Sequence, residues 1–207
     1  TQFMKVMGHT VAANVAGLLG VKGRLISITS ACATSTQCIG AGYESIQNGT
    51  ADLMICGGGD DLHPSTAGVF DVLHATSTKY NDNPTQTPRP FDCDRDGLVL
   101  SEGAGVIVLE EYDHAINRGA PILVEIVGYS TSCDVHHMTQ PNTDNMLDCM
   151  KSALDISGIK ANNLDYINAH ATGTPIGDAA EAAALRALVG DRVPISATKG
   201  FTGHMLA

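Results

Sequence analysis

The chain has 207 residues, of which 43% are apolar and 16% are charged, and its formal net charge at pH 7 is −10. This composition supplies enough apolar residues for a buried core and is typical of a folded domain. Nucleic-acid-binding proteins usually combine basic surfaces with aromatic residues, whereas this chain is acidic and has no Trp. Nucleic acid is therefore not an expected partner. No apolar run reaches the roughly 20 residues that a membrane-spanning helix needs, so no membrane span is expected.

The first residues and the cysteines bear on two questions: whether the sequence is part of a longer chain, and in which compartment the protein is expected. The opening residues TQFMKVMGHTV contain neither an initiating Met nor the basic and apolar segments of a signal peptide. We therefore expect the sequence to be an internal part of a longer chain. The six cysteines are irregularly spaced and form no CxxC pair, which favours reduced thiols over a disulfide framework or a zinc site. A cytoplasmic protein is expected.

Strands and helices alternate along the chain. Short apolar or β-rich runs predict the strands, and glycine stops mark the ends of the helices. The first part is expected to contain a strand at 24–29, a helix at 33–49, a buried strand at 51–61, a helix at 65–75, a polar loop at 76–97, and two strands with a short helix over 98–119. The second part is expected to contain a long strand at 121–134, a loop, a helix at 144–158, a strand at 164–174, a helix at 178–190, and a strand, a turn and the start of a helix over 193–207.

This alternation predicts a layered α/β fold. Reactive side chains in such folds gather at the carboxyl ends of strands. Three polar turns occupy such positions in the sequence: one at Cys32, one at His170, and one from Lys199 to His204. These turns are the candidate functional segments.

Cys32 is the candidate nucleophile. It lies in the run SACATS, between small residues at an expected strand-to-helix turn. The amino end of a helix favours the thiolate, and small neighbours allow a substrate carbonyl to approach backbone N–H groups. The alternative is that Cys32 is a small buried apolar residue, which is the interpretation preferred for Cys38, Cys56 and Cys149.

The two later turns supply candidate bases and hydroxyls. His170 follows an expected buried strand and precedes Thr172 and Thr174, whose hydroxyls can hold a polar ligand. Lys199 and His204 lie five residues apart across a glycine turn. Each of these residues taken alone can equally be structural. Asp178 and Glu181, three residues apart on one expected helix, are candidate partners for a buried Lys199.

Three motifs together resemble one family. The runs ACATS, NAHATGTPIGD and SATKGFTGHMLA, in this order and separation, resemble the β-ketoacyl synthases of the thiolase superfamily, in particular the elongating type that acts on acyl-carrier-protein thioesters. The segments PFDCDRDGLVLSEGAGVIVLEEYDHAINRGA and HHMTQP also resemble that family. The resemblance implies a layered α-β-α-β-α fold, of which this chain carries the later part of the first half and the earlier part of the second. Residues 1–119 would belong to the first half and residues 120–207 to the second.

The resemblance implies a role for each candidate residue. Cys32 would accept the acyl group as a thioester, while His170 and His204 would form the centre of decarboxylation and condensation. Lys199, paired with Glu181, would orient and tune the two histidines, with Asp178 in support. The substrate would be bound by four further residues: Thr172 and Thr174 at the phosphopantetheine arm, Phe70 at the acyl pocket, and Thr139 at the malonyl side.

The resemblance also implies partners. The expected reaction is a decarboxylative Claisen condensation in fatty-acid or polyketide synthesis, with acyl carrier protein as partner and no metal or cofactor besides the carrier's phosphopantetheine. A homodimer or a ketosynthase heterodimer is expected. The alternative functions are a non-catalytic subunit resembling a chain-length factor, or an inactive fragment. Initiating synthases and thiolases fit less well, because initiating synthases replace one histidine with Asn and thiolases use a second catalytic cysteine.

Overall fold

The computed structural model describes residues 7–134 and 139–207. Residues 135–138, which include the two histidines of the HHMTQP motif, lie outside the described residues. Two compact units emerge from the contacts between residues, and both are discontinuous in sequence. The first unit comprises residues 1–60, 103–126 and 206–207, and the second comprises residues 61–102 and 127–205. Because the units interleave along the chain, the expected division after residue 119 stays a prediction.

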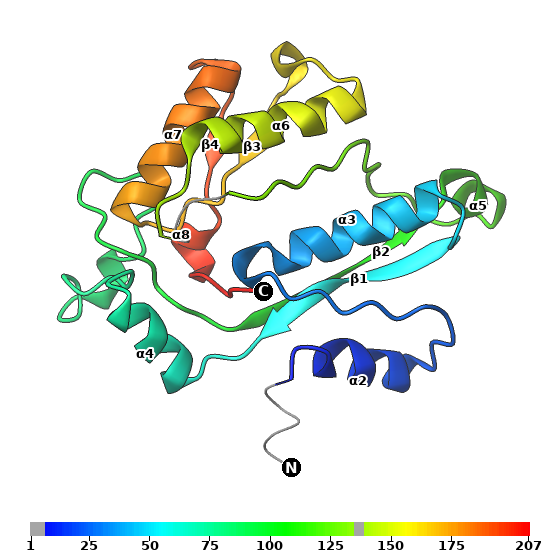
Figure 1. Ribbon diagram of the computed structural model, residues 1–207, viewed down its shortest axis with the longest axis horizontal. Coiled ribbons are helices and arrows are strands. Elements are labelled where there is room, and N and C mark those ends of the chain that lie inside the picture. The colour runs from blue at the N-terminus through cyan, green and yellow to red at the C-terminus, as the bar shows by residue number, and fades with distance from the viewer. Residues whose placement is uncertain (1–6, 135–138) are drawn as a thin grey trace. The chain divides into compact units, whose positions relative to one another are not determined.

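The first unit is built around an antiparallel pair of strands with a helix along it (Figure 1). Strand β1 (Leu53–Asp60) pairs with β2 (Gly103–Glu110), with Leu53 opposite Glu110 and Asp60 opposite Gly103. Helix α3 (Thr34–Gln47) packs on this pair. The other elements of the unit are helix α2 (Thr10–Leu19), the 3-10 turn η1 (Ala31–Ala33) and helix α5 (Tyr112–Asn117).

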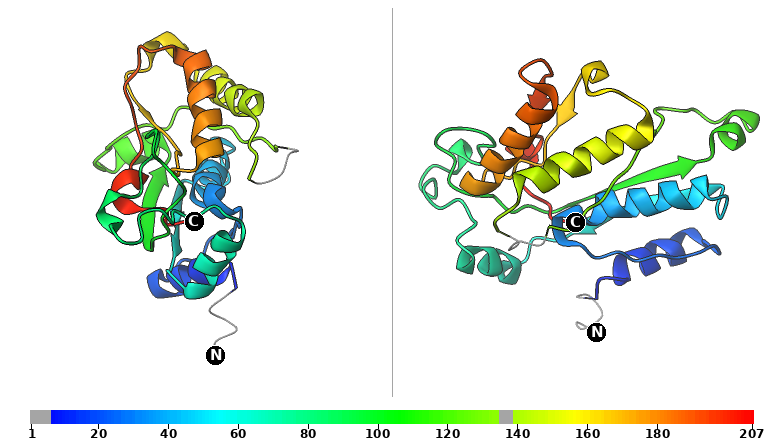
Figure 2. Two further views of the ribbon diagram at one scale, coloured as in Figure 1. Left: turned by 90° about the vertical axis from the view of Figure 1, so that its left-hand side faces the viewer. Right: turned by 45° about the horizontal axis from the view of Figure 1, so that its top comes forward.

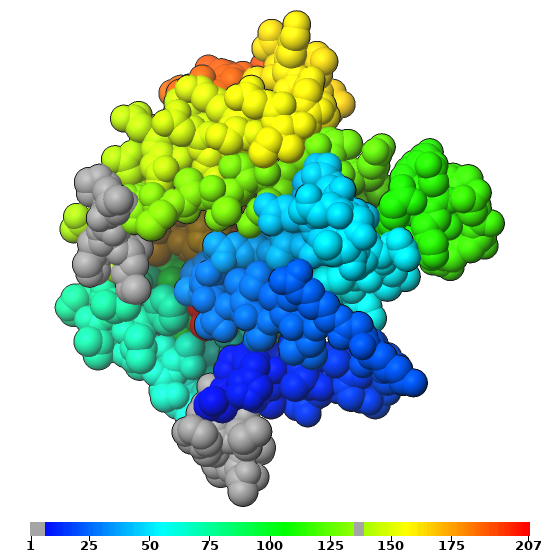
Figure 3. Space-filling model, turned by 45° about the vertical axis from the view of Figure 1, so that its right-hand side comes forward, coloured from blue at the N-terminus to red at the C-terminus, as the bar shows by residue number. Residues whose placement is uncertain are grey.

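Small residues allow helix α3 to approach the strands closely. Its buried residues are Gly40, Gly42 and Ser45. A Cβ atom at Gly42 would lie 2.4 Å from the Cys56 Sγ atom and 3.1 Å from the Leu109 Cδ1 atom, which is closer than packed atoms allow. A glycine is therefore required where α3 crosses the two strands. Helix α2, dark blue at the surface in Figure 3, has no buried residue.

The second unit contains a short parallel pair of strands with helices packed beside it. Strand β3 (Ile167–Asn168) pairs with β4 (Ile195–Ser196), and helices α6 (Thr143–Ser157) and α7 (Pro175–Val189) pack against each other (Figures 1 and 2). Its core contains Ala169, Ala171 and Leu185. The other elements are helix α4 (Pro64–Val72), helix α8 (Lys199–Thr202) and the 3-10 turns η2 (Pro84–Gln86) and η3 (Ala161–Asn163).

The predicted long helices are confirmed, and several predicted strands are wrong in length or absent. Helices α3, α6 and α7 match the expected ranges, and Gly49 and Gly158 adopt the positive φ angles of helix ends, 66° and 67°. Residues 24–29 and 121–134 are not strands, and the strand expected over 164–174 shrinks to β3. Extended backbone becomes a strand only when successive N–H and C=O groups form a ladder with a neighbouring strand, and within the described ranges these segments join no such ladder.

Two further expectations are corrected in detail. The strand expected to be buried over 51–61 is present as β1, but Cys56 is its one buried residue. Residues 98–102 do not form a strand that turns back on β2; instead Leu98 bridges to Thr76, and Leu100 bridges to His204. None of the helices in the described ranges combines the length and the apolar character needed to cross a bilayer.

Candidate active site

Strands β3 and β4 bring two of the three candidate turns together. The strands are parallel, so their carboxyl ends lie at the same edge. The Ala169 N–H continues the pairing by donating to the Ser196 carbonyl at 2.8 Å. His170 follows one residue later, and Lys199 opens helix α8 three residues after β4. The second unit therefore places the His170 turn and the Lys199–His204 turn side by side, as the sequence predicts.

The two histidines form an imidazole pair. Their ring centroids lie 5.5 Å apart and their planes are inclined at 84°, which is an edge-to-face arrangement. His204 is 3% exposed. Its backbone is fixed on both sides, because its N–H donates to the Val99 carbonyl at 2.8 Å and its carbonyl accepts the Ser101 N–H at 3.0 Å. The rings therefore present a preformed pair of nitrogen donors or acceptors.

A glycine permits the chain to reach His204. Gly203 has a φ angle of 70°, which side-chain-bearing residues rarely adopt. A Cβ atom there would lie 3.0 Å from both the Ser101 Cβ atom and the Val99 carbonyl oxygen. The TGH motif thus combines a left-handed backbone with close packing directly before the histidine.

Both imidazoles are neutral at physiological pH. Desolvation by the surrounding protein lowers the pKa of His170 to about 4, with a further contribution from the positive charge of Lys199. Desolvation likewise lowers the pKa of His204 to about 4, followed by the effects of His170 and Lys199. A neutral imidazole carries one N–H donor and one acceptor nitrogen. The pair can therefore donate two hydrogen bonds to an oxygen that becomes negative during a reaction.

Glu181 holds the backbone of the His170 turn. Its Oε1 and Oε2 atoms accept the N–H groups of His170 and Ala171, each at 2.7 Å. Desolvation raises the pKa of Glu181, and these two hydrogen bonds and the charge of Lys199 oppose that rise. Lys199 is thus close enough to influence Glu181 and both imidazoles. A direct pairing of the Lys199 and Glu181 side chains stays a prediction.

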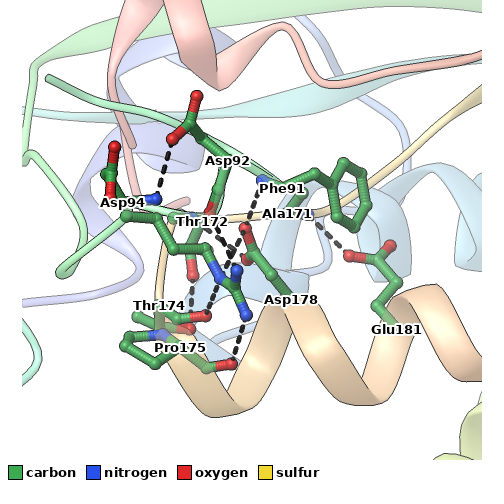
Figure 4. Close-up of polar contacts among 11 residues, drawn as sticks. Phe91, Asp92, Asp94, Ala171, Thr172, Thr174, Pro175, Asp178 and Glu181 are labelled. Carbon is green, nitrogen blue, oxygen red and sulfur yellow. Dashed lines mark hydrogen bonds and ion pairs between the residues drawn. The ribbon is translucent and has the colours of Figure 1, made fainter. Parts of the chain in front are cut away.

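The sequence suggested Asp178 as a partner for Lys199, but the structure gives Asp178 contacts with other groups. This residue is 1% exposed and its carboxylate accepts the Gly173 N–H at 3.0 Å and the Phe91 N–H at 2.8 Å (Figure 4). Its cationic neighbour is Arg95, whose Nε atom lies 3.8 Å from the Asp178 Oδ2 atom. The sequence interpretation missed Arg95, although the charged run FDCDRDG was the signal that could have indicated it.

The remaining candidates of the second unit occupy separate positions. The Thr172 and Thr174 hydroxyls lie 3.1 Å apart in the turn that precedes helix α7. Phe70 is half-buried on helix α4, and Thr139 is half-buried before helix α6. The binding roles of these four residues stay predictions.

Cys32 lies in the first unit, in the turn η1 directly before helix α3. The preceding residue, Ala31, has a φ angle of 46°, which is strained for a residue with a side chain and is common at functional turns. The turn is held by the Ala33 N–H donating to the Ser30 carbonyl at 3.0 Å and by the Ser30 N–H donating to the Thr34 hydroxyl at 2.9 Å. The thiol therefore sits at the positive end of a 14-residue helix, where a thiolate is favoured.

The other cysteines have different environments. None of the six cysteines, all of which lie in the described part of the chain, forms a disulfide. Cys56 is buried, and desolvation followed by the proximity of Cys38 raises the pKa of the Cys56 thiol to about 11. A thiol with this pKa is protonated and unreactive at neutral pH. Cys38 and Cys149 are half-buried, whereas Cys93 and Cys133 are exposed.

Comparison with known families matches two segments that together cover almost the whole chain. The profile of the β-ketoacyl synthase N-terminal domain matches residues 1–115, and that of the β-ketoacyl synthase C-terminal domain matches residues 123–207. A curated relative, 3-oxoacyl-[acyl-carrier-protein] synthase 1 of Escherichia coli strain K12, is 45% identical over 203 residues, which are 98% of this chain and 49% of the relative. The chain spans about half the length of the curated relatives it matches.

Solved structures agree in fold and sequence. A β-ketoacyl synthase from Burkholderia phymatum STM815 is 48% identical with a TM-score of 0.93, covering 96% of this chain and 48% of that one. A ketosynthase structure, described as a complex with a type II polyketide synthase acyl-carrier protein, is 34% identical with a TM-score of 0.92, covering 96% of this chain and 50% of that one. These matches confirm the predicted thiolase-like α/β fold. The chain belongs to the β-ketoacyl synthase family.

Proposed function

We propose that the protein is a β-ketoacyl-[acyl-carrier-protein] synthase of the elongating type, which condenses a Cys32-bound acyl group with a malonyl thioester. The observation that carries this proposal is the pair of neutral imidazoles, His170 and His204, with ring centroids 5.5 Å apart. Decarboxylation of a malonyl thioester moves negative charge onto its carbonyl oxygen, and two neutral N–H donors stabilise that charge.

The first step is acyl transfer to Cys32. The Cys32 thiolate attacks the carbonyl carbon of an acyl thioester, a new carbon–sulfur bond forms, and the carrier's thiol leaves after taking up a proton. The position of the thiol at the amino end of α3 supports this role, because the helix dipole lowers the cost of the thiolate. The acyl group is then held as an activated electrophile.

The second step is decarboxylation and condensation. The malonyl thioester carbonyl accepts hydrogen bonds from the His170 and His204 imidazoles while the bond to the carboxylate breaks and carbon dioxide leaves. The electron pair of that bond forms an enolate, whose carbon attacks the carbonyl of the Cys32 thioester. The Cys32 thiolate leaves, and the lengthened β-ketoacyl group remains on the carrier. The proposal requires the Cys32 thiol and the imidazole pair to face one substrate.

The other residues have supporting roles in the proposal. Lys199 favours the neutral imidazoles through its positive charge, and Glu181 orients the His170 turn through its backbone hydrogen bonds. Thr172 and Thr174 bind the phosphopantetheine arm, and Phe70 and Thr139 border the acyl and malonyl sides. The reaction balances without a metal or a redox cofactor. We further propose that the partner is an acyl carrier protein. The protein forms a homodimer or a ketosynthase heterodimer, and its location is cytoplasmic.

The two half-reactions provide the test. The Cys32→Ala variant should release carbon dioxide from a malonyl carrier-protein thioester but form no β-ketoacyl product, because it lacks the acyl acceptor. The His204→Ala variant should release carbon dioxide at least about a hundredfold more slowly, since one donor to the enolate oxygen is lost. Cys38→Ala is the matched control and should keep both activities. Condensation by Cys32→Ala would contradict the proposal, and a wild-type protein that neither decarboxylates nor condenses would favour the non-catalytic subunit.

A further inference from the structure

Arg95 connects a loop of the second unit to the start of helix α7. Its guanidinium donates three hydrogen bonds to backbone carbonyls: from Nε to Thr174 at 3.3 Å, from Nη2 to Pro175 at 2.8 Å, and from Nη1 to Asp92 at 2.8 Å. The side chain is 19% exposed. A rigid, planar fork of donors can join two consecutive carbonyls in this way, whereas an ammonium group cannot reproduce the geometry.

The position of Arg95 is electrostatically unfavourable in isolation. A cation at the amino end of a helix opposes the helix dipole. Asp178, in the first turn of α7, offsets this charge, with its Oδ2 atom 3.8 Å from the Arg95 Nε atom. Since Asp178 is 1% exposed, water does not reach its carboxylate, and Arg95 is the cation that lies beside it. The position of each of these two side chains therefore depends on the other.

The Arg95–Asp178 pair fixes the threonine turn from both sides. Asp178 accepts the Gly173 N–H at 3.0 Å, between the two threonines, while Arg95 binds the carbonyl of Thr174 itself. Asp178 also accepts the Phe91 N–H, from the loop that carries Arg95 (Figure 4). A Cβ atom at Gly173 would lie 2.8 Å from the Gly97 carbonyl oxygen, so the loop and the turn are in close contact.

We propose that Arg95 is a positioning residue for the Thr172 and Thr174 hydroxyls, and that it sets the affinity for the amide-containing pantetheine arm of the substrate. This inference rests on the proposed function. The two hydroxyls lie 3.1 Å apart and share one hydrogen bond. Each retains further hydrogen-bonding capacity for the amides of a linear ligand. Their spacing depends on the backbone atoms that Arg95 and Asp178 hold.

The test compares two substrates in the Arg95→Lys variant, which keeps the charge beside Asp178 but loses the fork. The KM for malonyl-pantetheine should rise about tenfold while kcat stays within about twofold, because one or two hydrogen bonds to the turn are lost. A truncated malonyl ethyl thioester, which lacks the arm, should show no change. Thr174→Val should abolish the effect of Arg95→Lys on KM, since the two changes act through the same hydroxyl.

Arg192→Lys is the matched control. Arg192 also donates to two backbone carbonyls, of Leu164 at 3.2 Å and Ala161 at 2.7 Å, but these belong to the segment around η3. This variant should leave both KM values unchanged. An equal loss with the truncated thioester, or the same loss in Arg192→Lys, would overturn the inference because it would indicate a general effect on the fold.

A binding measurement separates this inference from the proposed function. Calorimetric titration with pantetheine itself needs no turnover, and the affinity should fall about tenfold in Arg95→Lys. If Arg95→Lys does not fold, Arg95→Gln should show the same loss, because it removes the fork and leaves the Asp178 carboxylate in place to accept the N–H groups of Gly173 and Phe91. Weakened binding together with an inactive wild-type protein would refute the proposed function alone. Unchanged pantetheine affinity in the folded variant would refute the role of Arg95.

Discussion

At the scale of single residues, the protonation state of two imidazoles decides what the candidate site can do. A free histidine has a pKa near 6.5, whereas desolvation lowers the pKa of His170 and His204 to about 4. A protonated imidazole would carry a positive charge, which the neighbouring Lys199 repels and the surrounding protein solvates poorly. The neutral pair is therefore the form that the environment selects.

The lowered pKa values predict how activity responds to acid. The reaction needs neutral imidazoles, so activity should be retained as the pH falls through 6.5 and lost as it approaches 4. At pH 5.5 a group with a pKa of 4 is about 3% protonated, whereas an ordinary histidine is about 90% protonated. The measurement is kcat/KM for carbon dioxide release from a malonyl thioester between pH 4 and 8. A loss centred on pH 6.5, in protein shown to be folded by circular dichroism, would contradict this account.

Glu181 provides a second prediction at this scale. Its two oxygens accept two N–H groups, but the amide of Gln offers one oxygen and one further donor. In Glu181→Gln the N–H of His170 or of Ala171 would therefore face another donor. We expect kcat to fall about tenfold, corresponding to one lost buried hydrogen bond. The exposed Glu125→Gln variant is the control, and an unchanged kcat in Glu181→Gln would remove Glu181 from the account.

At the scale of elements, the close packing of α3 on β1 and β2 positions the Cys32 turn. Gly42→Ala places a methyl group against Cys56 and Leu109, and overpacking of this kind costs about 1–3 kcal/mol of unfolding free energy. Gly17→Ala is the matched control, because Gly17 lies within helix α2 with no atom within 4 Å of the added group. That change should be neutral or stabilising by up to about 1 kcal/mol.

Urea unfolding of the two variants measures this difference. The midpoint should fall in Gly42→Ala and should stay the same or rise in Gly17→Ala. Equal midpoints for the two variants would show that α3 does not approach the strands as closely as the structure indicates.

Elements with local signals could be predicted from the sequence, and elements that depend on partners could not. The Ala-rich composition of 178–190 and the glycine stops at Gly49 and Gly158 are local, and they located α7, α3 and α6. Whether 121–134 forms a strand depends on which chain segment pairs with it, and no pattern within those residues specifies that. The strand prediction there was wrong for this reason.

The residues of the candidate site likewise fall into those that the sequence could predict and those that it could not. His170, Lys199 and His204 were predictable because each follows a strand in a distinctive polar motif, and the parallel pairing of β3 and β4 gathers such turns at one edge. Arg95 was missed because its role depends on contacts across about 80 residues of sequence, with Thr174 and Pro175. The run FDCDRDG indicates a charged loop but does not specify which carbonyls it binds.

At the scale of the whole molecule, the proposed reaction needs residues from both units. The nucleophile belongs to the first unit and the imidazole pair to the second. The proposed condensation transfers the acyl group from Cys32 to an enolate that His170 and His204 stabilise. The proposed function therefore requires that these three side chains act on one substrate.

Cross-linking with 1,3-dibromoacetone tests this claim most directly. The Cys32 thiolate should displace one bromide, and the tethered bromoketone should then alkylate a ring nitrogen of His170 or His204. Peptide mapping by mass spectrometry identifies the bridged pair, and Cys32→Ala is the control that should lose it. We expect a Cys32–His170 or Cys32–His204 bridge. Alkylation of Cys32 with a bridge to any other residue, or with none, would contradict this expectation.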